Sequence, residues 1–353
     1  MQKDSLKPKR FHLIRHPSNE EAKPILTPRS GILWEKQAVF NPAIVQDGNI
    51  FKMLYRTYPD KLTETTPRLT RQGFYFGNQI SYIGYAESKD GKKFEARKEP
   101  FISPDTDYDR YGCEDPRITK FGDKFYITYT VIDFPIGDKT KRPNIRIALA
   151  TTKDFVSVTK HGIIGPPVRS KASALFPELV NGGKIALALT IASDSTNSHV
   201  AVRYFDSIDE VFQNSEENWN FFLDTSLKTA LLKTNWWLHR GPELGAPPIK
   251  TDRGWLFIYS AESMSDTWTI TAALADINEP HKIIARAPGY ILQPVTDYER
   301  EGLVPNVTFP SAAIVIDDEL YVYYGAADTV IGLAICKLNG LLDYLETFRD
   351  NTV

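Results

Sequence analysis

Alternating apolar and polar residues recur along the chain in short runs that end at turns rich in Gly and Asp. Each run begins near a proline, and a two-residue turn connects it to a second alternating run with many aromatic residues. A period of two is typical of strands, and a two-residue connection predicts a hairpin. The prolines that mark the five runs are Pro42, Pro116, Pro177, Pro248 and Pro310. Their spacings of 74, 61, 71 and 62 residues indicate one structural unit that is repeated five times.

A second pair of alternating segments follows these hairpins, for example at 80–86, 144–150 and 268–274. Two hairpins in each repeat predict a four-stranded antiparallel sheet. The pattern therefore predicts an all-β protein, a five-bladed β-propeller with four-stranded antiparallel blades. A tandem array of helix pairs is the alternative, but it requires a 3.6-residue period over stretches of about ten residues or more, which is scarce in this sequence.

Composition supports a single compact domain. The 353 residues are 42% hydrophobic and 12% aromatic, which suffices for the core of one closed propeller. We therefore expect one domain over 1–353, with 1–30 and 346–353 as extensions. A formal charge of −2 argues against nucleic acid or an anionic membrane as a partner. The amino terminus lacks the apolar segment of a signal peptide, so we expect a cytoplasmic location, or a periplasmic one if a signal peptide has been removed.

Cysteine and histidine give no sign of a metal centre. Cys113 and Cys336 are far apart and lack the spacing of a zinc knuckle. His199, His239 and His281 are scattered without metal-ligand spacing. We therefore expect no metal and no cofactor.

Polar residues recur near the start of the predicted inner strands. Asn41 and Asp115 directly precede a proline there, and Glu178 and Lys250 lie close to the same phase of their repeats. A propeller gathers equivalent positions of its blades around one axis, where the strands are usually small and apolar. Each of these residues could simply connect neighbouring blades by a hydrogen bond. Together they predict a polar ligand site at the axis.

Charge is concentrated around Asp115, because Glu114 and Arg117 flank it. Such a group could form either a salt-bridged corner or part of the site. The last repeat adds Tyr324 and Asp328, with small residues between them that allow a ligand to approach closely. Aromatic faces, carboxylates, an amide and a lysine together suit a carbohydrate, which presents an apolar C–H face and a ring of hydroxyls.

From about residue 31 to residue 345, these motifs resemble the mannoside-active enzymes of glycoside hydrolase family 130, which include mannosyl phosphorylases and mannosidases. The most specific segments are Glu114–Thr119, Leu175–Glu178, Pro247–Thr251, Val304–Val307 and Tyr324–Ala334. The resemblance implies inverting cleavage of a manno-oligosaccharide. It also implies that Asp115 is the general acid, which delivers its proton through a sugar hydroxyl. The residues that it places around the cleaved mannosyl unit are Asn41, Arg56, Lys250 and Asp328.

The residues that bind phosphate in phosphorylases of this family are changed in this chain. The family's His-Arg pair of the third repeat corresponds to Leu189 and Thr190, and its Tyr-His-Gly corresponds to 259–261. Lys171, with Arg169, is what remains for an anion. Each lost charge-assisted hydrogen bond is worth on the order of 1.5–3 kcal/mol. We therefore expect phosphate to be a poor nucleophile.

Water would need a base, and Glu243 is a candidate just before the fourth inner strand, with Glu178 assisting. Alternatively, Glu243 only pairs with Arg240. The sequence thus favours an inverting β-mannosidase that releases mannose, for β-1,2 linkages by resemblance only. A phosphorylase that forms α-mannose 1-phosphate and a noncatalytic mannoside-binding propeller remain alternatives, and the oligomeric state is left open. The loops at 60–79 and 193–219 are expected to set linkage and chain length.

Overall fold

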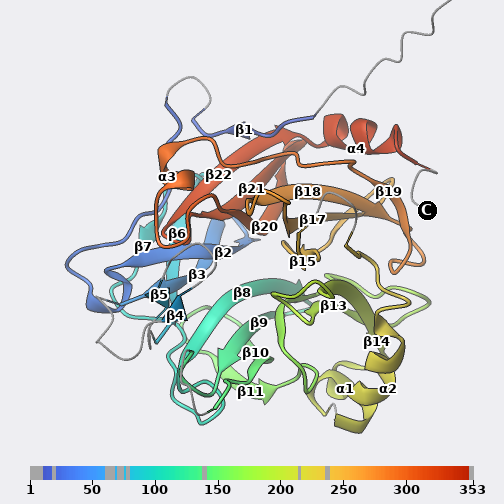
Figure 1. The fold of residues 1–353 in the computed structure, drawn as a ribbon, viewed down its shortest axis with the longest axis horizontal. Helices are drawn as coiled ribbons and strands as arrows, with labels where there is room; N and C mark the ends of the chain where they lie inside the picture. The colour runs from blue at the N-terminus through green and yellow to red at the C-terminus, as the bar shows by residue number, and fades with distance from the viewer. Residues whose placement is uncertain are drawn as a thin grey trace, which may run out of the picture.

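Five antiparallel sheets surround a central axis in the computed structural model (Figure 1). The structure describes residues 11–17, 21–59, 80–136, 141–213, 216–234 and 239–349, and it assigns two short strands at 68–69 and 75–76. This arrangement confirms the predicted five-bladed β-propeller. No helix within the described residues is long and apolar enough to cross a bilayer.

The first two blades have the four strands that the sequence predicts. From the axis outward, the first blade contains β2 (Ala38–Asp47), β3 (Ile50–Tyr58), β6 (Tyr82–Ser88) and β7 (Glu95–Ala96). The second contains β8 (Gly112–Phe121), β9 (Lys124–Ile132), β10 (Ile145–Thr152) and β11 (Thr159–Ile163). Beside them, β4 (Arg68–Leu69) pairs with β5 (Tyr75–Phe76), and the 3-10 helix η1 (Leu33–Glu35) precedes β2.

The third blade departs from the prediction, because its sheet has three strands in the described part of the chain. These are β12 (Ser170–Leu175), β13 (Ile185–Ile191) and β14 (His199–Phe205). Two helices follow, α1 (Ile208–Phe212) and α2 (Glu216–Ser226), and an isolated bridge between Val200 and Leu232 lies where a fourth strand would pair.

The fourth blade has a divided inner strand, because β15 (Glu243–Leu244) and β16 (Ile249–Thr251) both pair with β17. Its further strands are β17 (Gly254–Glu262), β18 (Trp268–Ala275) and β19 (Ile283–Arg286). The fifth blade contains β20 (Thr308–Ile316), β21 (Glu319–Ala326) and β22 (Val330–Lys337), with α3 (Asp297–Arg300) before it and α4 (Leu338–Glu346) after it.

The amino-terminal segment closes the ring. Strand β1 (Ile14–Arg15) pairs with β22 as the outermost strand of the fifth blade, with Ile14 opposite Ile335. This part of the expected extension over 1–30 is therefore a component of the last blade. The guanidinium of Arg15 donates from Nε and Nη2 to the buried carboxylate of Glu299, at 2.7 and 3.0 Å.

Apolar side chains fill the spaces between neighbouring blades. The alternation of the strands directs one set of residues into each interface, and five of the buried clusters each join two adjacent blades. The axis is different, because the starts of the inner strands carry polar and charged side chains.

Candidate active site

A bulge near the start of the inner strands positions the first polar residues. The pairing of β2 with β3 shifts between Phe40 and Ala43, and that of β8 with β9 shifts between Glu114 and Arg117. Asn41 and Asp115 occupy these two bulges, with φ angles of 48° and 49°. Asn and Asp adopt this left-handed conformation more readily than most residues, and bulges often redirect a side chain near functional sites.

The two bulge residues contact each other across the first two blades. Asn41 Nδ2 donates to Asp115 Oδ1 at 2.8 Å, and Arg56 Nη1 donates to the same oxygen at 3.1 Å. Burial favours the neutral form of Asp115, but the charges of Arg56 and Lys171 and the Asn41 hydrogen bond outweigh it and lower the pKa of Asp115 to about 2. In the ligand-free protein, Asp115 is therefore ionised.

Arg56 is held on several sides. Its Nη2 donates to Glu114 Oε1 at 2.5 Å, and its guanidinium lies 4.7 Å from the ring centre of Phe40 and 4.8 Å from that of Tyr58. Two carboxylates and two aromatic faces thus fix the orientation of one cation. Glu114 was not among the site residues predicted from the sequence. Its position next to Asp115 was the only signal, and a salt-bridged corner explained it equally well.

The fifth blade contributes Asp328, which has a φ angle of 50°. Burial raises the pKa of Asp328 to about 6, although Arg56 opposes this shift. The blade also approaches Asn41 closely, because a Cβ built on Gly325 would lie 2.2 Å from Asn41 Oδ1. A glycine at 325 is therefore required for Asn41 to reach Asp115.

A basic cluster, which we define as Arg169, Lys171 and Arg240, lies between the start of the third blade and the segment that precedes β15 of the fourth. Lys171 Nζ lies 4.0 Å from Glu114 Oε2, next to the Asp115 group. Arg169 donates to Asp194 Oδ2, and Arg240 Nη1 lies 4.0 Å from Asp194 Oδ1. Burial favours a neutral Asp194, but Lys171 and Arg169 outweigh it and lower the pKa of Asp194. Asp194 lies in the loop at 193–219 but was not predicted as a site residue, because no motif marks it.

Glu243 lies beside this cluster and is 4% exposed. Its Oε1 accepts a hydrogen bond from the backbone N–H of Asp194 at 3.2 Å. Burial and the negative charge of Asp194 raise the pKa of Glu243 to about 7, against the opposing charge of Lys171. The alternative that Glu243 pairs with Arg240 is wrong, because Arg240 Nε lies 2.8 Å from Glu262 Oε2 instead.

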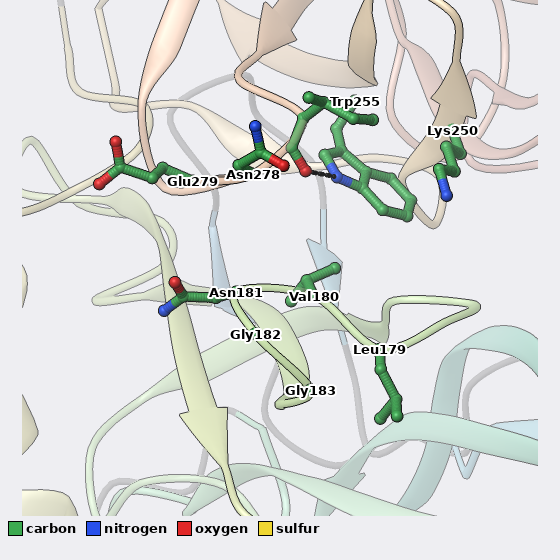
Figure 2. Close-up of a pocket in the computed structure, with 10 residues that line it drawn as sticks. Leu179, Val180, Asn181, Gly182, Gly183, Lys250, Trp255, Asn278 and Glu279 are labelled. Atoms are coloured by element: carbon green, nitrogen blue, oxygen red, sulfur yellow. Dashed lines mark hydrogen bonds between the residues drawn. The ribbon is translucent and has the colours of Figure 1, made fainter.

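Glu178 and Lys250 do not join this group, which corrects the expectation of a shared pocket. They pair with each other at 2.6 Å, and their side chains are 45% and 48% exposed. Lys250 lines a cavity of about 440 Å³ together with Trp255 and the turn at 181–183, at the other end of the inner strands (Figure 2).

The reason for this error is the phase of the repeat. In the second blade the bulge immediately precedes Pro116, whereas in the third blade it falls at Ala172, five residues before Pro177. In the fourth blade, Glu243 pairs with Ser260 well before Pro248. The prolines of these three repeats therefore lie at different distances from the polar end of their inner strands.

Two further residues assigned to substrate binding have other partners. Tyr324 is 0% exposed, and its hydroxyl donates to Glu299 at 2.8 Å, so it belongs to the network that holds β1. Arg117 is 1% exposed and donates to the carbonyl oxygens of Gly245, Asp115 and Pro116 at 2.5 to 3.0 Å. Arg117 therefore connects the second blade to the fourth and fixes the backbone at Asp115.

Thr190 occupies one of the two positions at which phosphorylases of this family have a His-Arg pair, and here it has a structural role. It is fully buried, and its hydroxyl accepts a hydrogen bond from the backbone N–H of Leu244 at 2.8 Å. This position now ties the third blade to the fourth. The loop at 60–79, with its predicted role in specificity, lies outside the residues whose side chains are described.

One group of side chains has the composition of a metal site. In the described part of the chain, His239, Glu262 and Asp266 bring ligand atoms within 4.8 Å of one another. Arg240 lies 2.8 Å from Glu262, and His239 Nδ1 lies 2.8 Å from Asp266 Oδ1. A guanidinium already supplies positive charge to this group, so we propose no metal there.

Comparison with known proteins establishes the family. Residues 29–347 match glycoside hydrolase family 130, described as β-1,4-mannooligosaccharide phosphorylase, and the chain belongs to this family. It is 35% identical over 319 residues to a 1,2-β-oligomannan phosphorylase of Thermoanaerobacter sp. (strain X514), which covers 90% of this chain and 96% of the relative. It is also 32% identical over 286 residues to a β-1,2-mannobiose phosphorylase of Listeria innocua, which covers 79% of this chain and 74% of the relative.

A solved structure agrees with the fold. The β-1,2-mannobiose phosphorylase from Listeria innocua in complex with β-1,2-mannobiose superposes with a TM-score of 0.76 at 24% identity, over 96% of this chain and all of that chain. Both sequence relatives described above carry the name of a phosphorylase. They therefore favour the phosphorylase alternative over the hydrolase predicted from the sequence.

Proposed function

We propose that the protein is a β-mannoside phosphorylase that transfers the terminal mannosyl unit of β-1,2-linked manno-oligosaccharides to inorganic phosphate and forms α-mannose 1-phosphate with inversion. The observation that carries this proposal is the 35% identity to a 1,2-β-oligomannan phosphorylase over nine-tenths of the chain. The basic cluster supports it, because a dianionic phosphate requires several fixed cations or backbone donors. Lys171 links this cluster to the Asp115 group.

In the proposed reaction, a phosphate oxygen forms a bond to the anomeric carbon while the bond to the leaving sugar breaks on the opposite face. The leaving oxygen takes the proton that originates at Asp115, through a sugar hydroxyl as the family resemblance implies. Because Arg56 keeps Asp115 ionised in the free protein, the bound mannosyl unit must weaken this ion pair before Asp115 can carry a proton. Asn41, Arg56 and Asp328 would bind the hydroxyls of that unit.

The test is to incubate the protein with β-1,2-mannobiose in the presence and absence of inorganic phosphate and to identify the products. We expect mannose 1-phosphate and one equivalent of mannose, formed only when phosphate is present. Release of two equivalents of mannose at a rate that does not depend on phosphate would contradict the proposal.

Hydrolysis is the second candidate, and Glu243 is the specific observation that favours it. A buried carboxyl group whose pKa is about 7 can accept a proton from water near neutral pH. In this case Glu243→Gln abolishes mannose release in phosphate-free buffer, while mannoside binding persists because the amide keeps the size of the side chain. A phosphorylase would instead keep its phosphate-dependent activity in this variant.

A further inference from the structure

We infer that the carboxylate of Asp194 occupies the basic cluster in the free protein and competes there with inorganic phosphate. Asp194 would then determine how the enzyme divides the mannosyl unit between phosphate and water. This inference deepens the proposed function and rests on it for the reaction, although the competition itself can be measured without turnover.

The contacts of Asp194 place its carboxylate against two guanidinium groups, and the charge of Lys171 acts on it as well. Arg169 donates to its Oδ2, and Arg240 Nη1 lies 4.0 Å from its Oδ1. Lys171 is close enough that its charge is the largest factor stabilising the ionised form of Asp194. In return, Asp194 is the largest factor that raises the pKa of Lys171 against its burial.

The backbone supports this orientation. Asp194 has a φ angle of 60°, and Ala192, two residues earlier, has one of 53°. Ser195 Oγ donates to the carbonyl oxygen of Ala192 at 2.6 Å, and the N–H of Asp194 donates to Glu243 at 3.2 Å. Left-handed conformations of residues other than glycine persist where surrounding contacts hold them. The segment after β13 is thus shaped so that Asp194 faces the basic cluster.

Carboxylates and phosphates are recognised by the same guanidinium geometry. Phosphate that binds at Arg169 would therefore have to displace the carboxylate of Asp194. Displacement is feasible, because the side chains of Asp194 and Arg169 are 33% and 43% exposed. By contrast, the carboxylates of Glu114, Glu243 and Glu262, which also lie next to the cluster, are almost fully buried and would stay in place.

The direct experiment measures phosphate binding by calorimetry without mannoside, in wild type and in Asp194→Asn. The matched control is Asp206→Asn, because Asp206 also pairs with a cation, Lys184, but its side chain is exposed to solvent. We expect Asp194→Asn to bind inorganic phosphate at least about tenfold more tightly than wild type, because one charge-assisted competitor is lost. The control variant should bind phosphate as wild type does.

Phosphate binding in Asp194→Asn that is equal to or weaker than in wild type would overturn the inference. Melting curves of all variants establish that they are folded, and Asp194→Ser provides a second neutral residue if the asparagine variant is not. With β-1,2-mannobiose as substrate, Asp194→Asn should also raise the ratio of mannose 1-phosphate to mannose at subsaturating phosphate. If wild type forms only mannose whereas Asp194→Asn forms mannose 1-phosphate, the proposed function is refuted but the inference is supported.

Discussion

At the scale of single residues, the site depends on Arg56, whose guanidinium interacts with two carboxylates and two aromatic rings. It donates to Asp115 and Glu114 and lies between the rings of Phe40 and Tyr58. One cation that serves two carboxylates keeps Asp115 charged, while Asp328, in the same electrostatic environment, has its pKa raised to about 6. Carboxylates with such different proton affinities are a common basis for acid and base roles.

The first prediction concerns Asp115→Asn. Asparagine tolerates the left-handed conformation of this bulge and retains an acceptor for Asn41, so we expect the fold and mannoside binding to persist. Turnover should fall by roughly 10²-fold or more, because general acid catalysis typically supplies at least that factor. Steady-state kinetics measures the effect, with the exposed turn substitution Asp123→Asn as control. Turnover within a few-fold of wild type would exclude Asp115 as the acid, and loss of binding would make its role structural.

The second prediction concerns Glu243 and pH. Its pKa in the folded protein is raised to about 7 from an ordinary value of 4.5. The folded state therefore binds this proton more tightly than the unfolded state, and the stabilisation is present below pH 4.5 and lost as the pH rises through 7. Glu243→Gln keeps the neutral form at every pH. We expect this variant to melt a few degrees above wild type at pH 8 and close to it at pH 4.5, and a pH-independent difference would contradict this reasoning.

At the scale of elements, the bulges and the close approach of blades decide which side chains meet. The third prediction uses Gly325 of β21, where a Cβ would lie 2.2 Å from Asn41 Oδ1 and 3.0 Å from its backbone nitrogen. Gly325→Ala should displace Asn41 from Asp115 and lower kcat/KM by roughly 10²-fold, the effect of a misplacement of about 1 Å. Gly289→Ala is the control, since no atom lies within 4 Å of its Cβ position. Equal activity in the two variants would show that Asn41 is not positioned by this contact.

Element patterns also show what the sequence could and could not predict. Turn spacing and alternation of apolar residues predicted five blades, because hairpins leave a local signal. Asn41 and Asp115 were placed correctly relative to each other, because their bulges directly precede a proline in both repeats. Glu178 and Lys250 were misplaced, because in the third and fourth blades the proline falls later along the inner strand. Asp194 has no motif at all, since only the path of the chain after β13 brings it to the basic cluster.

At the scale of the whole molecule, closure of the ring joins the two ends of the chain. Strand β1 completes the fifth blade, and the Arg15 guanidinium is held by the carboxylate of Glu299, which is fully buried and also accepts from Tyr324. This arrangement makes a short amino-terminal segment a structural part of the last blade.

The fourth prediction tests this closure. Arg15→Ala leaves the buried charge of Glu299 without its partner, and breaking such a pair costs about 3–5 kcal/mol. The matched control is Lys337→Ala in the neighbouring strand β22, because its pair with Glu319 is exposed and worth about 0–1 kcal/mol. Urea denaturation should show a much larger loss for Arg15→Ala. Similar losses in the two variants would mean that Arg15 does not hold the ring closed.

The central claim is that this propeller transfers a mannosyl unit to phosphate, and the stoichiometry of phosphate consumption tests it most directly. Phosphorus NMR can follow a reaction of the unmodified protein with β-1,2-mannobiose at millimolar phosphate. The proposed function predicts that one inorganic phosphate disappears for each mannobiose cleaved and that one α-mannose 1-phosphate appears. Cleavage of mannobiose with an unchanged phosphate signal would contradict the claim and identify water as the nucleophile.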